Sequence, residues 1–467
     1  RLFGPFLPRY WTVRLFVAAS SAVTIDAASE TRLLDREVSS QRLGLDIDLH
    51  AARLARLPEA LRLFAALRRR AGDDRLRQVW LSFGQIEALL AANLVGEAVE
   101  QADRLLELAR PPLLADVRGE AYRLASNAYA ANRDTLRSAQ YAKVAARLYN
   151  RRGFEAFSLV AQRRACALVP DRRRIVLLGS IVERLDAAGL RAEAVSARVS
   201  RLESAVRVGR WDVVADEQRA LARLRNDGSV LSRVEAWYGE AHARAAVGQN
   251  GPAARAASRG LALLAEHRTT LGATELRANV AGLGESLAAV GLDLAMRSGR
   301  PGAVWEAVER WRAGATAERG VTTPELAEAL AELRGVQSRR AEVLAGELDP
   351  GDFERRLSRA ENRVRWAARL ADGGRPASDP PASLAAVRGS LGDRVMVEIV
   401  EHAGSYLAVV LAAGRRARMV PLASCDAVEA ARAELAFALR RLCRAGLSPR
   451  AASMAVASGT AAIAELG

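Results

Sequence analysis

The sequence predicts a mainly α-helical protein, in which a solenoid of helical hairpins is followed by one further hairpin and then by the first strands of an α/β domain. Three observations predict this fold. Half of the 467 residues are hydrophobic and only 5% are aromatic, a composition typical of packed helices. Hairpin-like segments of similar length recur along the chain. Alternating apolar residues, typical of a strand, begin at Val395.

The clearest repeat is the 34-residue segment from Val234 to His267. Gly248 stands near its middle and divides it into two helices. In the second helix, Ala253 and Gly260 lie seven positions apart, so both face the preceding helix and let the two backbones approach closely. The segment therefore predicts a helix-turn-helix hairpin.

Other segments repeat this pattern with more variation. A single helical hairpin cannot bury its apolar face alone, so neighbouring hairpins must stack into a right-handed solenoid with a continuous core. We expect residues 1–314 to form this array, and its concave face to bind a protein or peptide partner. The further predicted hairpins are 81–108, with Asn93 at the turn, 120–149, with Asn132, 175–202, with Gly189, 206–224, with Gly209, and 291–314, which closes the array.

A separate helical hairpin is predicted over residues 323–372. Thr323 and Pro324 supply an N-cap and a first-turn proline, and Asp349-Pro350-Gly351 supplies the break between the two helices. In the second helix, apolar residues at strict 4-3-4-3 spacing form a heptad seam, which favours an antiparallel coiled-coil-like pair. The seam residues are Phe353, Leu357, Ala360, Val364 and Ala367.

Residues 371–381 are rich in Gly and Pro and read as a linker to a new domain at 382–467. Three strands with short turns between them predict an antiparallel meander, at about 395–400, 406–411 and 418–422. A helix starting at Asp426 has an apolar stripe and is expected to cover one face of that sheet.

The net charge is +15, and the sequence pI is near 10.8. Such a charge attracts polyanions, which leaves a nucleic-acid-binding regulator as a weak alternative. The densest runs, Arg68 to Arg70 and Arg172 to Arg174, are not interleaved with aromatic residues, so we interpret them as solvated helix faces. We expect no specific nucleic acid and no membrane partner. No apolar run is long enough to span a bilayer, and the best N-terminal one, Leu15 to Val23, is short.

The cysteines predict neither a disulfide framework nor a metal site, because they are three in number, far apart and in no CxxC spacing. This favours a reducing cytoplasm. Cys166 and Cys443 fall within helical patterns and are expected to be buried. Cys425 starts a helix, and His402 lies in a hairpin turn; these two are the one conceivable catalytic pair, although a polar turn residue and a helix-start cysteine are the simpler interpretation. The remaining histidines are His50, His242 and His267.

The sequence holds no GxxxxGK[ST], GxSxG or HExxH motif, and no GxGxxG that follows a strand. Paired acids are expected to be solvated, and two tryptophans in one repeat helix are expected to pack between helices rather than line a pocket. We therefore predict no catalytic, cofactor-binding or metal-ligating residue and no small-molecule cofactor. The acids and tryptophans are Glu398 and Glu401, Glu306 and Glu309, and Trp305 and Trp311.

Two family resemblances follow from these residues. The order Trp237, Ala241, Gly248, Ala253 and Gly260 resembles tetratricopeptide (TPR) repeats. The stretch SLAAVRGSLGDRVMVEIVEHAGSYLAVVLAAGRRARMVPL, with ELAFALRRL after it, is similar to the start of the caspase-like CHAT domain found behind TPR arrays in bacterial proteins.

The CHAT resemblance implies a caspase-like α/β sandwich with a His and Cys dyad. The His-Gly and Cys segments of that family belong to later strands, so no catalytic residue is carried over to this chain, and we expect it to be part of a longer protein. The implied function is a protein-interaction scaffold in a parent cysteine endopeptidase. A non-enzymatic TPR signalling adaptor is the alternative.

Overall fold

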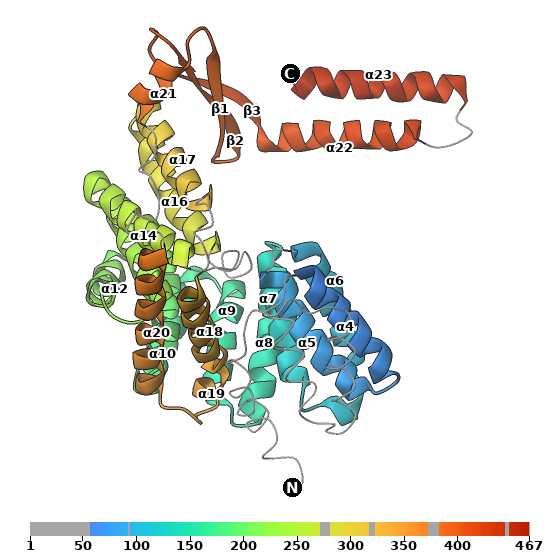
Figure 1. The fold of residues 1–467 in the computed structure, drawn as a ribbon, viewed down its shortest axis with the longest axis vertical. Coiled ribbons are helices and arrows are strands. Elements are labelled where there is room, and N and C mark those ends of the chain that lie inside the picture. Colours follow the sequence, from blue (N-terminus) through green and yellow to red (C-terminus); the bar gives the residue numbers. More distant parts are fainter. Residues whose placement is uncertain are drawn as a thin grey trace. The chain divides into compact units, whose positions relative to one another are not determined.

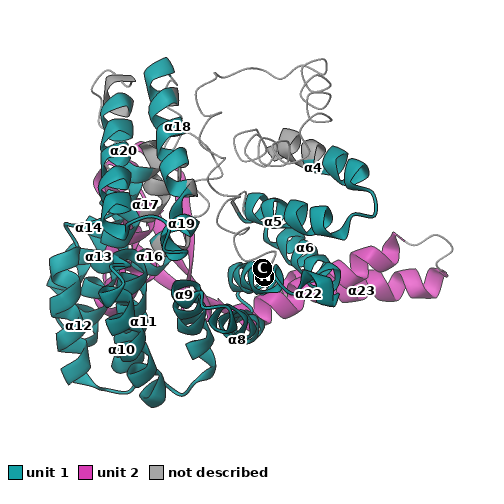
Figure 2. Cartoon of the chain, turned by 90° about the horizontal axis from the view of Figure 1, so that it is seen from below, with its two compact units in different colours: residues 1–287, 314–379 teal, residues 288–313, 380–467 magenta. Residues whose placement is uncertain are grey.

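The computed structural model describes residues 57–91, 94–270, 281–316, 323–371, 383–443 and 448–466 (Figure 1). The described chain is mainly helical with one small antiparallel sheet, which confirms the predicted class at this level. It divides into two compact units, shown in teal and magenta in Figure 2. The first contains 1–287 and 314–379, and the second contains 288–313 and 380–467.

The first unit begins with helices that pack in two alternating layers, because each helix contacts the next along the chain and α5 also contacts α7. Tight turns separate the helices, and Asn132, a predicted turn residue, is the C-cap of α7. Asn93, the turn residue predicted before it, lies outside the described residues. The helices are α4 (Leu57–Ala71), α5 (Arg75–Ala91), α6 (Val95–Leu108), α7 (Arg118–Ala131), α8 (Thr135–Arg151) and α9 (Glu155–Ala165).

A second group of stacked helices follows a short 3-10 turn, Cys166–Leu168, and Pro170. Gly248 adopts a φ of +76° at the turn between α13 and α14, a conformation that glycine reaches without steric cost. A Cβ added to Gly260 of α14 would lie 3.2 Å from the Trp237 Cβ of α13, so the predicted close approach of these two helices is confirmed. The helices are α10 (Asp171–Ala187), α11 (Arg191–Arg207), α12 (Trp211–Leu224), α13 (Val230–Ala246) and α14 (Asn250–Thr270).

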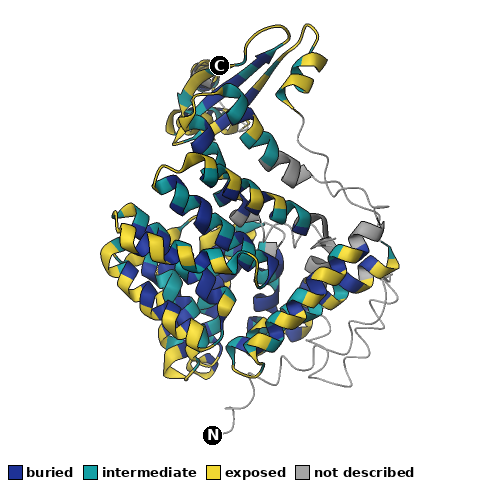
Figure 3. Ribbon diagram, turned by 90° about the vertical axis from the view of Figure 1, so that its left-hand side faces the viewer, coloured by how far each residue is buried: buried dark blue, intermediate teal, exposed yellow. Residues whose placement is uncertain are grey.

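The hairpin of α18 (Pro324–Ser338), α19 (Arg340–Leu344) and α20 (Pro350–Ala371) packs on this second group rather than standing apart from it. The five predicted seam residues of α20 are all buried. Polar contacts join the hairpin to the stacked helices. The Arg340 guanidinium donates to Glu193 of α11 at 2.6 and 3.0 Å, and the Val230 amide donates to Glu361 at 3.0 Å. Figure 3 shows that the helices of this unit carry a buried and an exposed face.

The second unit is built on a three-stranded antiparallel meander in the order β1, β2, β3, as predicted. Val395 pairs with Ala412 and His402 with Ser405 at the two ends of the first hairpin. One face of the sheet packs on α17 and the last turns of α16, so residues 291–314 support the sheet instead of closing the repeat array. The elements are α16 (Ala281–Arg297), α17 (Pro301–Thr316), α21 (Leu384–Ser390), β1 (Val395–His402), β2 (Ser405–Ala412) and β3 (Arg418–Ser424).

The helix after β3 does not cover the sheet, so that prediction was wrong. Helix α22 (Cys425–Leu442) begins directly after β3, with Ser424 as its N-cap, and no connecting loop lets it fold back across the strands. It pairs with α23 (Pro449–Leu466) instead, where Ala438 lies close to Gly459. The opposite face of the sheet keeps Val397 and Ile399 exposed, together with Val395.

Candidate binding surface

The helices α5, α7 and α9 form one layer of the first helical group, and their polar side chains join across it. Arg123 of α7 lies 3.6 Å from Glu87 of α5, and its Nε donates to Glu120 at 2.8 Å. The Tyr149 hydroxyl of α8 donates to the same Glu120 carboxylate at 2.7 Å. Burial acts to lower the pKa of Arg123, but the charge and hydrogen bond of Glu120, together with Tyr149, hold that pKa above its usual value. Arg123 therefore has an acidic partner on its own helix.

Arg164 of α9 lies in the same layer and has no acidic partner in the described part of the chain. Its guanidinium donates to the Ser126 hydroxyl at 3.3 Å and to the side-chain oxygen Oδ1 of Asn127, both on α7. Burial, together with the charges of Arg163 and Arg123, lowers the pKa of Arg164 to about 10. A buried cation without a counter-charge is costly, so this position favours an anionic ligand.

An aromatic cluster lies between α6, α7 and α8. Tyr129 is buried, its hydroxyl donates to the Asp103 carboxylate at 2.8 Å, and Arg137 donates to that hydroxyl at 3.2 Å. The ring of Tyr141 is 5.4 Å from that of Tyr129 and 5.8 Å from that of Tyr122. Here every charged group has a partner of opposite charge or a hydrogen bond, so we assign the cluster a structural role.

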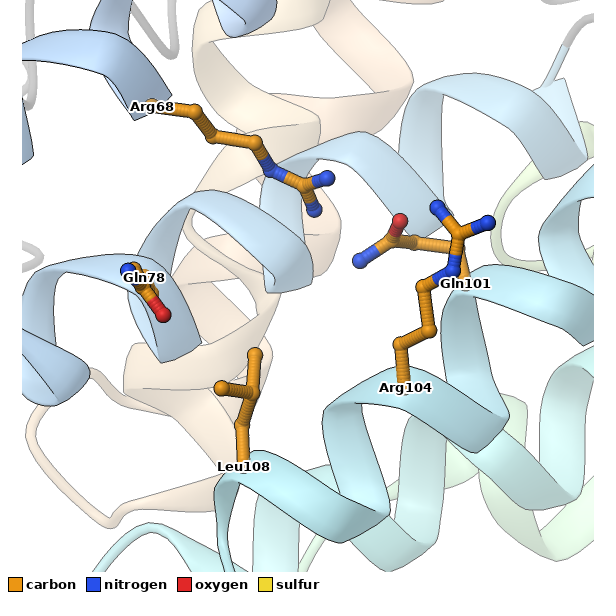
Figure 4. Close-up of a pocket in the computed structure, with 5 residues that line it drawn as sticks. All are labelled: Arg68, Gln78, Gln101, Arg104 and Leu108. Atoms are coloured by element: carbon orange, nitrogen blue, oxygen red, sulfur yellow. The ribbon is translucent and has the colours of Figure 1, made fainter. Parts of the chain in front are cut away.

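A cavity of about 200 Å³ lies between α4, α5 and α6 (Figure 4). Two guanidinium groups reach into it from different helices, Arg68 from α4 and Arg104 from α6, and Figure 4 shows them converging on the same space. Arg104 also pairs with Glu100 one turn earlier on α6, whereas Arg68 has no acidic partner among the described residues. The remaining lining residues are Gln78, Gln101 and Leu108.

The fully buried Ser82 of α5 organises this cavity. Its hydroxyl accepts hydrogen bonds from Arg68 Nη2 at 3.2 Å and from Gln101 Nε2 at 3.0 Å. It donates in turn to the Gln78 carbonyl oxygen at 2.8 Å. One hydroxyl therefore orients an arginine and an amide from two other helices, and both side chains are held in place before any ligand arrives.

These residues are not predicted as ligands from the sequence. Arg68 belongs to a run predicted to be a solvated helix face, and no role is predicted for Arg104 or Arg164. Within that run only Arg69 and Arg70 are exposed, and within the other run Arg172 and Arg173 are exposed while Arg174 is partly buried. A local signal existed in the position of Arg68, which lies four residues after the buried Phe64 and so faces the packed side of α4.

His402 and Cys425 do not form a dyad. His402 lies on the sheet face that packs on α16, where its Nε2 is 3.4 Å from an Asp293 oxygen. The Cys425 thiol lies near Glu401 and Tyr406, which pair across the hairpin on the opposite face. Desolvation and the Glu401 charge raise the pKa of the Cys425 thiol, the reverse of what a nucleophilic cysteine needs.

Other expectations are answered by burial. Cys166 is buried, as predicted, and desolvation raises the pKa of its thiol, whereas Cys443 is exposed because it lies at the end of α22. Trp305 is buried in the core beneath the sheet, as predicted. Glu398 is 8% exposed, so the expectation that it is solvated was wrong: it lies on the packed face of β1.

Among the acids and tryptophans that remain, Glu401 and Glu306 are exposed, as predicted, Glu309 is partly buried, and the side chain of Trp311 lies outside the described part. The ring of His242 stacks on that of Tyr238 at 5.8 Å, and burial lowers the pKa of His267 to about 4. His50 lies outside the described residues. No group of three potential metal ligands is found in the part of the chain that the structure describes.

Comparison with known proteins gives no family assignment: no family model matches the chain, and no curated protein matches it significantly. Among the described helices, none combines the length and the apolar character that crossing a membrane requires.

Proposed function

We propose that the chain is a protein-interaction scaffold from a TPR-CHAT protein, and that it binds acidic protein segments on the layer formed by α5, α7 and α9. We identify this layer with the concave face that the repeat pattern predicts. Stacked helical hairpins present extended surfaces, and the specificity of such surfaces resides in a few side chains rather than in the scaffold.

Arg164 is the observation that carries this proposal. Its charge is partly buried, no acid among the described residues neutralises it, and two neighbouring arginines reinforce the positive potential. An aspartate or glutamate of a partner would complete a charge-assisted hydrogen bond with a guanidinium that is already held in position. Arg123 on the same layer is paired with acids, whereas Arg164 has only neutral hydrogen-bond partners among the described residues.

The test measures binding of a fluorescent peptide of alternating glutamate and alanine to the full chain, at low and at moderate salt. Replacing Arg164→Gln should weaken binding roughly tenfold, because one charge-assisted contact is lost. Arg147→Gln is the matched control, since Arg147 is exposed on α8 and its substitution removes the same charge. Equal losses in the two variants would show that only the overall charge attracts the peptide, and would count against the proposal.

The enzymatic part of the proposal concerns the longer parent protein, in which the dyad would belong to residues outside this chain. The opposite-face placement of His402 and Cys425 favours a recognition role for the chain itself. A peptidase parent would cleave peptides under reducing conditions while this chain binds without cleaving. A parent that binds and never cleaves would make the signalling adaptor the better description.

A further inference from the structure

We propose that the cavity between α4, α5 and α6 binds a phosphate monoester, with Arg68 and Arg104 as its cationic ligands. This site is separate from the acidic-peptide surface, since it uses α4 and α6 rather than α7 and α9. The inference goes beyond the proposed function, because a scaffold needs no second anion site in order to bind a partner.

The cavity is lined by two cationic side chains. Two guanidinium groups from different helices point into the same small space (Figure 4). Burial lowers the pKa of Arg68, and the charge of Arg104 lowers it further, so the two cations repel each other when the cavity holds no anion. Glu100 offsets part of the Arg104 charge, and both side chains of this ion pair are well exposed, Arg104 at 60% and Glu100 at 65%. An anion between the two guanidinium groups removes the repulsion.

Two of the hydrogen-bond donors of the cavity are already positioned. Ser82 holds Arg68 at 3.2 Å and Gln101 at 3.0 Å, and Gln101 is only 4% exposed. Side chains fixed in this way lose little rotamer entropy when a ligand binds. An apolar core would stabilise these helices better than a buried polar cluster beneath an arginine that lacks an acid. The polar cluster therefore points to ligand binding.

The volume and the donors of the cavity indicate the class of its ligand. A volume of about 200 Å³ is smaller than that of pockets that hold whole cofactors. The cavity therefore holds one charged group and the first atoms of the molecule to which that group is attached. A phosphate monoester carries between one and two negative charges at neutral pH and three acceptor oxygens, which suits two guanidinium forks and the amide of Gln101. A carboxylate offers a single charge and two oxygens. Leu108 supplies an apolar wall for the carbon to which the phosphate is attached.

The experiment titrates the full chain by calorimetry with three probes: inorganic phosphate, a capped phosphoserine peptide, and the same peptide with glutamate in place of phosphoserine. We expect saturable binding of both phosphate probes below about 1 mM. Binding of the glutamate peptide should be roughly tenfold weaker. If only the phosphopeptide binds, the peptide that carries the phosphate contributes to affinity. If inorganic phosphate binds equally well, the phosphate group alone is recognised. Both results support the site.

Variants locate the binding. Arg68→Gln and Arg104→Gln should each weaken phosphate binding roughly tenfold or more, and Glu100→Gln should strengthen it a few-fold by freeing Arg104. Arg110→Gln is the matched control, because Arg110 is exposed, pairs with Glu107 and lies outside the cavity. Arg68→Lys keeps the charge without the planar fork and covers the case in which Arg68→Gln fails to fold. The proposal is overturned by an equal loss in Arg110→Gln, by equal affinity for the glutamate peptide, or by no saturable binding of any probe.

Discussion

Two regions of the first unit use arginine in opposite ways. In α10 to α14, buried acids are matched with arginines: Glu217 is 1% exposed and lies 3.0 Å from Arg198 and 2.5 Å from Arg201. In α4 to α9, Arg68 and Arg164 have only neutral hydrogen-bond partners among the described residues. The composition of the two regions is similar, so the count of arginines says little. What separates a structural arginine from one available to a ligand is the presence of a buried acid.

The largest expected effect comes from removing a buried acid from the region in which arginines are paired, α10 to α14. Glu217→Ala leaves two partly buried guanidinium groups without their shared carboxylate, and Arg198 and Arg201 are only 19% and 26% exposed. We expect the free energy of unfolding to fall by about 2 to 4 kcal/mol. Urea denaturation followed by far-UV circular dichroism measures it.

The matched control for that variant is Asp216→Asn, one position earlier on α12. Its ion pair with Arg219 is exposed on both sides, so the urea midpoint should hardly move. A similar fall in both variants would mean that burial of the acid is not what distinguishes the two regions.

A smaller effect on stability is expected from the hairpin of α18 to α20, which packs on the second group of helices. Glu361 of α20 is 6% exposed and accepts the Val230 amide at 3.0 Å, which satisfies one of the free amides at the start of α13. The pKa of Glu361 is raised to about 7, chiefly by desolvation. The charge of Glu354 acts in the same direction, while the Val230 amide, Arg365 and Arg233 act against it.

Because the pKa of Glu361 is higher in the folded than in the unfolded chain, the folded protein binds more protons between pH 4.5 and 7. Protonated Glu361 makes its full contribution to the free energy of unfolding below about pH 4.5, and this contribution is lost as the pH rises through about 7. We expect the free energy of unfolding to be about 1 to 3 kcal/mol lower at pH 8 than at pH 5. Glu361→Gln keeps an acceptor for Val230 and should flatten this part of the profile; an unchanged profile in that variant would assign the pH dependence to other groups.

The sequence predicted the helices and the meander because their signals are local. The turn at Gly248 and the seam of α20 are each visible within one or two helical turns. The position of residues 291–314 under the sheet was not predicted, since an apolar helix face does not say which surface it will cover. The cavity was missed for the same reason: Arg68 and Arg104 are 36 positions apart, and only packing brings them together.

The smallest expected effect concerns Arg164, which has no acidic partner among the described residues. Arg164→Gln, which should weaken binding of the acidic peptide, removes a partly buried charge that no acid compensates, and the glutamine can still hydrogen-bond to Ser126 or Asn127. We expect the variant to be as stable as the parent chain or more stable by up to about 1 kcal/mol, the usual exchange of binding function for stability. Arg198→Gln, which removes one of the two arginines that pair with the buried Glu217, should lose stability in the same urea assay. If Arg164→Gln loses as much as Arg198→Gln, then Arg164 is a structural arginine, and the absence of an acid beside it does not mark a binding site.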